Sequence, residues 1–216
     1  MSVSTLQEKD QSFMDVIQGR HSVREYDPNF VISREEMKEM LTLAAKAPSS
    51  SNMQHWRFLV IDSKELKEKL LPIANSQQQV AQASAVIAIL GDVEGYRKAE
   101  RIYAQAAEAG YMPQELARSF AERSTSLYSS LPYEKVREVA VVDASLAAMQ
   151  LMLVAHAKGY DTVPMGGYDK EKFIQAFGLG QRYVPVMLIA IGKAAKPGHP
   201  TARLPIDEVV FWNEIS

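Results

Sequence analysis

The spacing of apolar residues predicts a short helix near the start of the chain. Over residues 13–19, Phe13, Val16 and Ile17 fall on one helical face, and Gly19 would end the helix. The next residues, RHSVREYDP, contain charged and polar groups at alternate positions and follow no helical period. A helix followed by an extended polar segment is therefore expected.

A second helix is predicted to begin at Ser33. The spacing of Ser33 and Glu36 is that of a capping box, and an apolar stripe of methionine, leucine and alanine follows. The helix should end before Pro48, because a residue that precedes proline is pushed out of the α region. A third helix, charged and amphipathic, is predicted over residues 63–71.

Apolar runs of strand length predict the sheet. WRFLVID (56–62), SAVIAIL (84–90) and YVPVMLIAIG (183–192) are rich in β-branched and aromatic residues, and a shorter strand with a glycine-rich turn is expected at 161–169. The continuous run at 84–90 indicates a strand in the middle of a sheet. Because the regular alternation of a doubly wound fold is missing, we expect an α+β protein with helices flanking a small, mainly antiparallel sheet.

The segment from Glu138 to Lys158 is apolar nearly all round and rich in small residues. A helix without a wide polar face is buried on all sides. Two interpretations are equally compatible with this pattern, namely a helix at a dimer interface and the core helix of a monomer. The charge-free part, Ala144 to Ala157, is too short and too polar for a membrane span.

Two further regions flank the expected core of a single domain spanning residues 1–216. Residues 92–135 are polar and helical, and they could form an excursion that covers a site. Residues 193–216 contain three prolines and end near VVFW. So long an irregular stretch is unusual inside a compact domain, and an extended C-terminal arm on the surface of a partner subunit explains it better.

The composition excludes several functions. Hydrophobic residues make up 47% and charged residues 23% of the 216 residues, and the net charge is −2. No global basic field is available to bind nucleic acid or an anionic membrane. The chain has no cysteine, which fits a reducing cytoplasm, and residues 1–13 have no apolar core typical of a signal peptide.

Common catalytic motifs are missing as well. GLGQRY (178–183) lacks the third glycine of a dinucleotide fingerprint and precedes a strand, and no phosphate-binding P-loop is present. The four histidines are scattered, so we expect no metal site. The difficult chemistry would then belong to an organic cofactor.

Two segments have the chemistry of a ligand site. Arg20, Ser22 and Arg24 alternate, so in an extended segment they point the same way and could bind a phosphate. A solvated basic turn is the simpler explanation of that cluster taken alone. The paired glycines of PMGGYD (164–169) would let a ligand approach the backbone closely, although most such pairs only form turns.

Taken together in order, these segments resemble the FMN-dependent nitroreductase family. The similarity consists of Arg-x-Ser-x-Arg at 20–24, the stretch PSSSNMQHW at 48–56, a Pro-x-x-Gly turn at 164–167 and an Arg-Leu-Pro at 203–205. It extends over about residues 12 to 212. The resemblance implies a homodimer with FMN sites at its interface, each built from both chains.

The resemblance also implies which residues bind FMN. One subunit would supply Arg20 and Arg203 for the phosphate, Arg24 near the pyrimidine edge of the flavin, and residues of the glycine turn against one flavin face. The other would supply the serine-rich loop. The full set of expected cofactor-binding residues is Arg20, His21, Ser22, Arg24, Pro48, Ser49, Ser50, Asn52, Gln54, Gln79, Pro164, Gly166, Gly167 and Arg203.

Some positions differ from the family pattern. His55 replaces a proline before the tryptophan, and Gly166 stands where some members have a glutamate. The run 76–79 replaces an asparagine and a lysine near the flavin, and Thr201 replaces a second phosphate-binding lysine. These differences bear on the choice of substrate and on the flavin potential.

Three functions follow from the resemblance. The favoured one is an oxidoreductase that uses NADH or NADPH in ping-pong hydride transfer to nitroaromatics, quinones or flavins, with no catalytic side chain of its own. The second is an FMN enzyme of the same fold with a specialised reaction, such as dehalogenation, flavin cleavage or dehydrogenation. The third is a flavin-binding module without catalysis.

Overall fold

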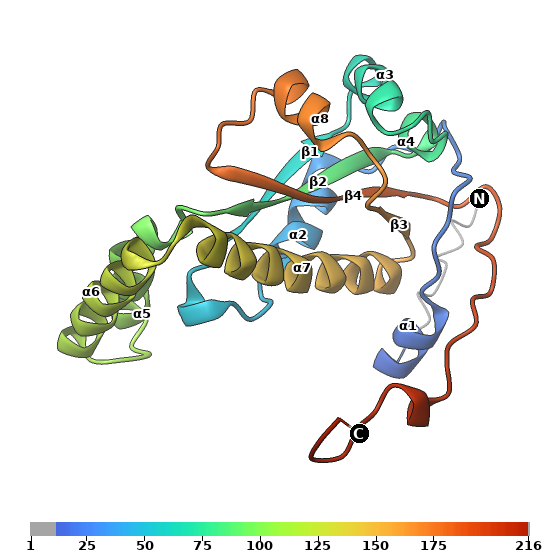
Figure 1. Ribbon diagram of the computed structural model, residues 1–216. Helices are drawn as coiled ribbons and strands as arrows, with labels where there is room; N and C mark the ends of the chain where they lie inside the picture. Colours follow the sequence, from blue (N-terminus) through green and yellow to red (C-terminus); the bar gives the residue numbers. More distant parts are fainter. Residues whose placement is uncertain (1–11, 216) are drawn as a thin grey trace, which may run out of the picture.

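One antiparallel sheet organises the chain (Figure 1). The computed structural model describes residues 12–215; residues 1–11, where no signal peptide is expected, and Ser216 lie outside the described part. Within residues 12–215 the strands are β1 (Trp56–Ile61), β2 (Ala85–Asp92), β3 (Asp161–Met165) and β4 (Tyr183–Gly192), in the order β1-β2-β4-β3. Every neighbouring pair is antiparallel, and the predicted α+β class is confirmed.

The central strands are buried on both faces. Every residue of β2 is buried. Because successive side chains alternate between faces, Ile87 and Ile89 enter one core, while Val86, Ala88 and Leu90 enter the other. This two-sided burial explains the continuous apolar run that marked β2 in the sequence.

Helices cover both faces of the sheet (Figure 1). On one face lie α2 (Arg34–Ala44) and α7 (Tyr133–Ala157), and on the other lie α3 (Lys64–Ile73), α4 (Gln79–Gln82) and α8 (Lys170–Phe177). Side chains cap the N-termini of three of these helices: Ser33, Ser63 and Asp169 each accept a bond from a backbone amide of the first turn.

Helix α7 is a core helix with one exposed apolar stripe. It begins five residues before the predicted segment, because Pro132 occupies its N-cap. Ala140 lies so close to β2 that a Cβ on Gly91 would stand 3.1 Å from its backbone. The opposite face exposes Val142, Leu146 and Met149 by 57%, 43% and 43%. Helix α7 is long and apolar enough to cross a membrane, but its other face forms part of the core.

The segment predicted as a helical excursion contains η2 (Gly95–Lys98), α5 (Ala99–Glu108) and α6 (Gln114–Ser130). These elements project from the end of the sheet where β2 ends (Figure 1). They have a small core of their own, which includes Tyr103 and Tyr128 and also Met53 from the serine-rich loop. The excursion is therefore packed onto that loop.

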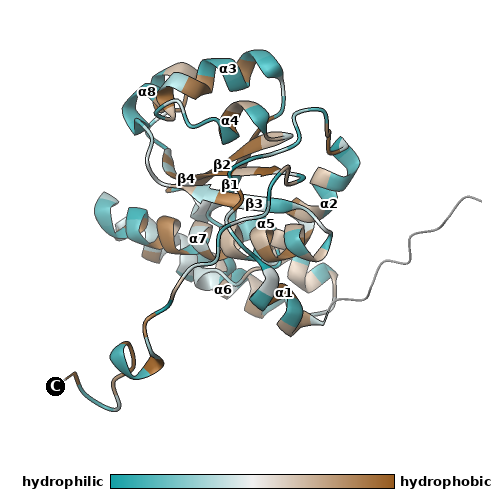
Figure 2. Cartoon of the chain, turned by 90° about the vertical axis from the view of Figure 1, so that its right-hand side faces the viewer, coloured by the Kyte–Doolittle hydropathy of each residue, from teal (hydrophilic) through white to brown (hydrophobic). Residues whose placement is uncertain are grey.

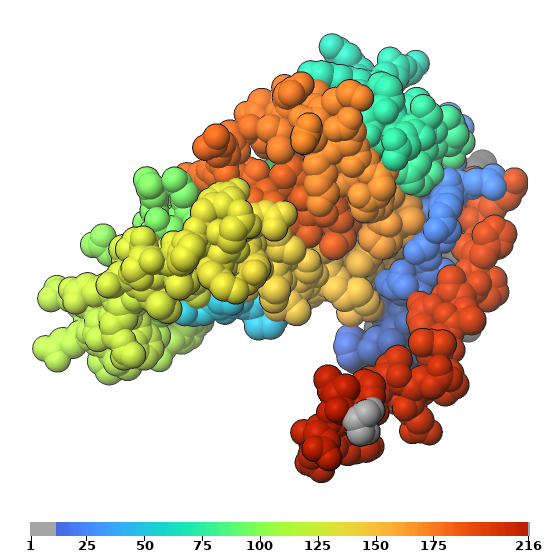
Figure 3. All heavy atoms as spheres, viewed as in Figure 1, coloured from blue at the N-terminus to red at the C-terminus, as the bar shows by residue number. Residues whose placement is uncertain are grey.

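The C-terminal arm runs along the opposite end of the molecule, beside the N-terminal segment that includes α1 (Phe13–Gly19) (Figures 1 and 3). Backbone bonds join Ala195 to Glu25 and Asp27 to Lys193. Beyond this, η3 (Ile206–Glu208) leads to a segment that stands away from the body (Figure 2). Its large apolar side chains are exposed: Leu204, Ile206, Val209, Phe211, Trp212 and Ile215.

Candidate functional site

The segment Arg20–Arg24 lies beside the edge strand β3. The amide of Val23 donates to the carbonyl of Thr162 at 3.1 Å, and Ser22 forms a parallel bridge with the same residue. Val23 is buried in the sheet-side core, so the alternate side chains of Arg20, Ser22 and Arg24 lie toward the outside. The extended geometry expected from the sequence is present.

The basic side chains of Arg20, His21 and His156 gather at one corner of the molecule. Gly19 packs on the ring of His156, and a Cβ on Gly19 would lie 2.7 Å from its Nε2. Burial lowers the pKa of His156; the charge of Asp161 opposes this shift, and the charges of Arg20 and His21 add to it. Arg20 and His21 lie close enough to each other to bind one anion together.

The glycine turn follows directly after β3. Pro164 is exposed on this edge strand, and a Cβ on Gly166 or Gly167 would meet no atom within 4 Å, so the backbone is open to a ligand. The carbonyl of Gly167 accepts bonds from Asn75 Nδ2 at 2.9 Å and from Gln77 Nε2 at 3.0 Å. The turn is thus held by the loop between α3 and α4.

Gln79 supports this turn from the inside. Its side chain is buried, and Nε2 donates to Met165 Sδ at 3.4 Å and to Gln77 Oε1 at 3.0 Å. The side-chain amide of Gln79, a residue expected at the cofactor, therefore donates its hydrogen bonds within the protein. Asn75 is a residue of this turn that the sequence alone did not reveal. Its φ is 54°, in the left-handed region, which asparagine adopts more often than most residues do.

The arm brings Arg203 toward the same end of the molecule. Gly198 lies against the Arg20–Arg24 segment, where a Cβ would stand 2.8 Å from the carbonyl oxygen of Ser22. Arg203, five residues further along, is exposed, and its guanidinium donates to Thr201 Oγ1 at 2.7 Å. Thr201 thus orients an arginine for which the family resemblance implies a phosphate-binding role.

The serine-rich loop is an ordered structure rather than a plain connection. Ser49 Oγ accepts a bond from the amide of Gln54 at 3.1 Å. Ser50 donates to Asp143 Oδ1 through both its amide and its hydroxyl, at 3.0 and 3.1 Å. The hydroxyl of Ser50 is thereby directed to α7, whereas Pro48 and Asn52 are exposed at the surface of the loop.

The loop also contains backbone strain. Ser51, Asn52 and Gln54 have φ values of 49°, 56° and 51°, in the left-handed region that non-glycine residues rarely adopt. Each such residue costs about 1–3 kcal/mol and persists where surrounding contacts fix it. Strain of this kind is concentrated at functional sites, which strengthens the assignment of the loop to a site.

Within one chain, the expected site residues form two separate groups. The loop is attached to α7 at Asp143, whereas the cationic corner is attached near His156. Thirteen residues of helix separate these points, about 20 Å along the axis. The Arg20 segment, the glycine turn and the start of the arm therefore form one group, and residues 48–54 form a second.

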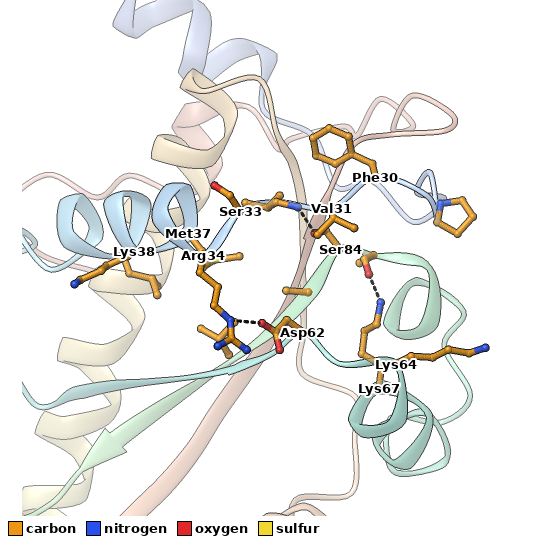
Figure 4. Close-up of a pocket in the computed structure, with 16 residues that line it drawn as sticks. Phe30, Val31, Ser33, Arg34, Met37, Lys38, Asp62, Lys64, Lys67 and Ser84 are labelled. Atoms are coloured by element: carbon orange, nitrogen blue, oxygen red, sulfur yellow. Dashed lines mark hydrogen bonds and ion pairs between the residues drawn. The ribbon is translucent and has the colours of Figure 1, made fainter.

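A groove follows the outer edge of the sheet, where β1 has no partner strand within the described chain (Figure 4). A pocket of about 640 Å³ is lined by apolar side chains that include Phe30, Met37 and Val60. A second pocket of about 480 Å³ continues along Trp56 and Phe58, and the two share Lys38 and Leu41. Arg34, Lys64 and Lys67 add positive charge at the rim of the first pocket, with Asp62 as counter-charge.

The Nitroreductase family profile matches residues 17–193. The chain belongs to the nitroreductase family. It is 52% identical over 206 residues to a candidate NAD(P)H nitroreductase of Bacillus subtilis, YdgI, covering 94% of this chain and 99% of that protein. It is also 40% identical over 191 residues to the CLA biosynthesis enone reductase of Lactiplantibacillus plantarum, covering 87% and 88%.

Solved structures of nitroreductase relatives share the fold. A candidate nitroreductase from Exiguobacterium sibiricum, crystallised in complex with FMN, superposes with a TM-score of 0.91 at 47% identity, covering 97% of this chain and 100% of that one. A candidate NAD(P)H:FMN oxidoreductase from Staphylococcus epidermidis gives 0.91 at 43% identity, covering 98% and 100%. The family expected from the four sequence segments is confirmed.

Proposed function

We propose that this nitroreductase-family protein is an FMN-dependent oxidoreductase that takes electrons from NADH or NADPH and passes them to a small electron-poor acceptor. The observation that carries the proposal is the combination of the neighbouring basic side chains of Arg20 and His21 with the open backbone at Gly166 and Gly167. A phosphate fits the first and a flat ring fits the second. When bound, FMN supplies the group that accepts and returns a hydride.

The protein residues bind and orient in this scheme. Arg20 and Arg203 hold the phosphate, and Arg24 places a positive charge near the ring system. Asn75 and Gln77 fix the glycine turn through the Gly167 carbonyl, so the backbone presents a rigid face. Donor and acceptor use the same space in turn, which gives ping-pong kinetics, and nitroaromatics, quinones and flavins are the proposed acceptors.

The complete site requires two copies of the chain. We place two α7 helices, one from each chain, antiparallel across a two-fold axis. If the axis passes near Met149, midway along the helix between Asp143 and His156, then Asp143 of one chain lies level with His156 of the other. Met149 is exposed and belongs to the apolar stripe with Val142 and Leu146. Such an isologous contact would bring the serine-rich loop of one subunit to the cationic corner of its partner.

The C-terminal arm would complete this dimer by lying in the groove beside β1 of the partner subunit. The arm offers exposed apolar side chains, including Phe211 and Trp212, and acidic groups at Asp207, Glu208 and Glu214. The groove offers an apolar floor, a strand edge that is unpaired within residues 12–215, and a basic rim (Figure 4). Pairing would cover a strand edge that would otherwise favour aggregation.

The test of the proposed function is flavin binding followed by turnover. Purified protein incubated with FMN should retain flavin after gel filtration and should then oxidise NADH or NADPH when a nitroaromatic or quinone is present. A conjugated enone belongs in the acceptor panel, because an enone reductase is 40% identical to this chain. Protein that retains no FMN would refute the proposal.

A further inference from the structure

The strained loop is anchored first by a buried group on α7. Asp143 is 1% exposed and lies in an otherwise apolar stretch of that helix. Its carboxylate accepts two bonds from Ser50, and its second oxygen lies 2.7 Å from Nδ1 of His55, which is fully buried. Because a buried carboxylate is costly unless its oxygens are bonded, this arrangement fixes the loop on the α7 side.

The excursion holds the same loop from the other side. Tyr103 donates from its hydroxyl to the carbonyl of Ser51 at 2.8 Å, and the hydroxyl of Tyr128 donates to Ser51 Oγ at 3.3 Å. Both tyrosines are nearly buried, and Met53 enters the core of the excursion beside them. Ser51, the residue at φ 49°, is therefore bonded through both its backbone and its side chain.

We propose that Tyr103 and Tyr128 are positioning residues that hold the serine-rich loop in its cofactor-binding shape before FMN arrives. This inference rests on the proposed function, since it assigns the loop to the FMN site. Left-handed backbone at three non-glycine residues would relax if its contacts were removed. A loop that is already ordered loses less conformational entropy on binding, so the tyrosine hydroxyls contribute to FMN affinity without touching FMN.

The excursion would then do more than cover a site. Helices α5 and α6 carry the two hydroxyls, so their placement determines the placement of the loop. In the proposed dimer, this loop belongs to the site whose phosphate corner lies on the partner subunit. A change in the excursion of one subunit would then alter flavin binding at that shared site.

The experiment compares Tyr103→Phe and Tyr128→Phe with Tyr96→Phe as the matched control. Phenylalanine keeps the ring and removes only the hydroxyl. Tyr96 stacks on Tyr128, with ring centroids 6.2 Å apart, and its hydroxyl makes no hydrogen bond within the described residues. The FMN dissociation constant should rise about 3–10-fold in each test variant, more for the shorter bond of Tyr103, and should stay unchanged in the control.

A double-mutant cycle separates positioning from general loss of structure. Ser51→Ala removes the acceptor of Tyr128 and leaves the tyrosine in place, so its effect on FMN affinity should not add to that of Tyr128→Phe. The rate of flavin reduction at saturating FMN should fall in Tyr103→Phe, while the KM for the nucleotide stays close to that of the wild type. Neither effect is expected from lower thermal stability alone.

A negative result for FMN binding and a negative result for the tyrosine variants would refute different proposals. Wild-type protein that binds no FMN would refute the proposed function itself. Wild-type protein that binds FMN, with unchanged affinity and reduction rate in both tyrosine variants, would refute the positioning role and leave the proposed function intact. Should Tyr103→Phe fail to fold, the cycle of Ser51→Ala and Tyr128→Phe still decides: additive effects would overturn the inference.

Discussion

A charge at Met149 should separate the two subunits and release FMN. Met149 is 43% exposed on α7 and lies near the proposed two-fold axis, so Met149→Lys would place two ammonium groups close together in the dimer. At a separation of about 6–8 Å and an effective dielectric constant of about 20, their repulsion is about 2–3 kcal/mol. Losing the burial of the remaining methionine surface adds about 1 kcal/mol for each copy.

The sum corresponds to a dimer that is roughly 10³-fold weaker. Analytical ultracentrifugation over a range of protein concentrations measures the dissociation constant, and flavin retained after gel filtration measures occupancy. Leu66→Lys is the control, because Leu66 is 38% exposed on α3, on the other side of the sheet (Figure 1). It should leave both quantities unchanged.

A charge exchange makes this test specific for the axis. Met149→Glu alone should weaken the dimer in the same way as Met149→Lys. A mixture of the two variants should form a heterodimer and regain FMN, because unlike charges then meet near the axis. A Met149→Lys protein that remains a dimer would refute the proposed interface, and a monomer that keeps its FMN would refute the shared site.

Three further results are expected. Arg203→Ala should weaken FMN binding by about 1.5–3 kcal/mol, measured by calorimetry, because one charge-assisted contact is lost; unchanged affinity would remove Arg203 from the phosphate site. Trp212→Ser should weaken the dimer in ultracentrifugation if the arm lies in the partner's groove, and an unaltered dissociation constant would argue against this placement. Burial alone would raise the pKa of Asp92, but hydrogen bonds from Arg182 and the charge of Arg57 hold that pKa below its ordinary value. The stability that this ion pair contributes is therefore complete above about pH 4 and is lost as the pH falls further. In urea unfolding, Asp92→Asn should lower the free energy of unfolding by about 3 kcal/mol at neutral pH and should remove much of this acid dependence.

The sheet could be predicted because each strand has a strong local signal. The run at 84–90 is apolar without interruption and too short for a typical helix, and it forms β2. The long apolar helix was also evident, but not which of its faces is exposed. The exposed face depends on tertiary packing. The face with small residues such as Ala140 packs against Gly91 of β2, and the face with Met149 is therefore exposed.

The polar contacts of the site could not be predicted, because they join residues that are far apart in the chain. His55 lies 88 positions from Asp143, and Asn75 lies 92 positions from Gly167. A lone aspartate within an apolar helix is a sequence signal for a buried partner, but the partner cannot be named without the fold. For the same reason, the sequence could not show that the side chains of Ser50 and Gln79, which are expected at the cofactor, also bond within the protein.

A stopped-flow experiment on the protein reconstituted with FMN tests directly whether NADH or NADPH reduces the bound flavin. NADH or NADPH, mixed without oxygen, should bleach the flavin absorbance in a single phase that depends on nucleotide concentration. A nitroaromatic, a quinone or an enone, mixed afterwards, should restore the absorbance. Bound flavin that neither nucleotide reduces would contradict the proposed oxidoreductase function.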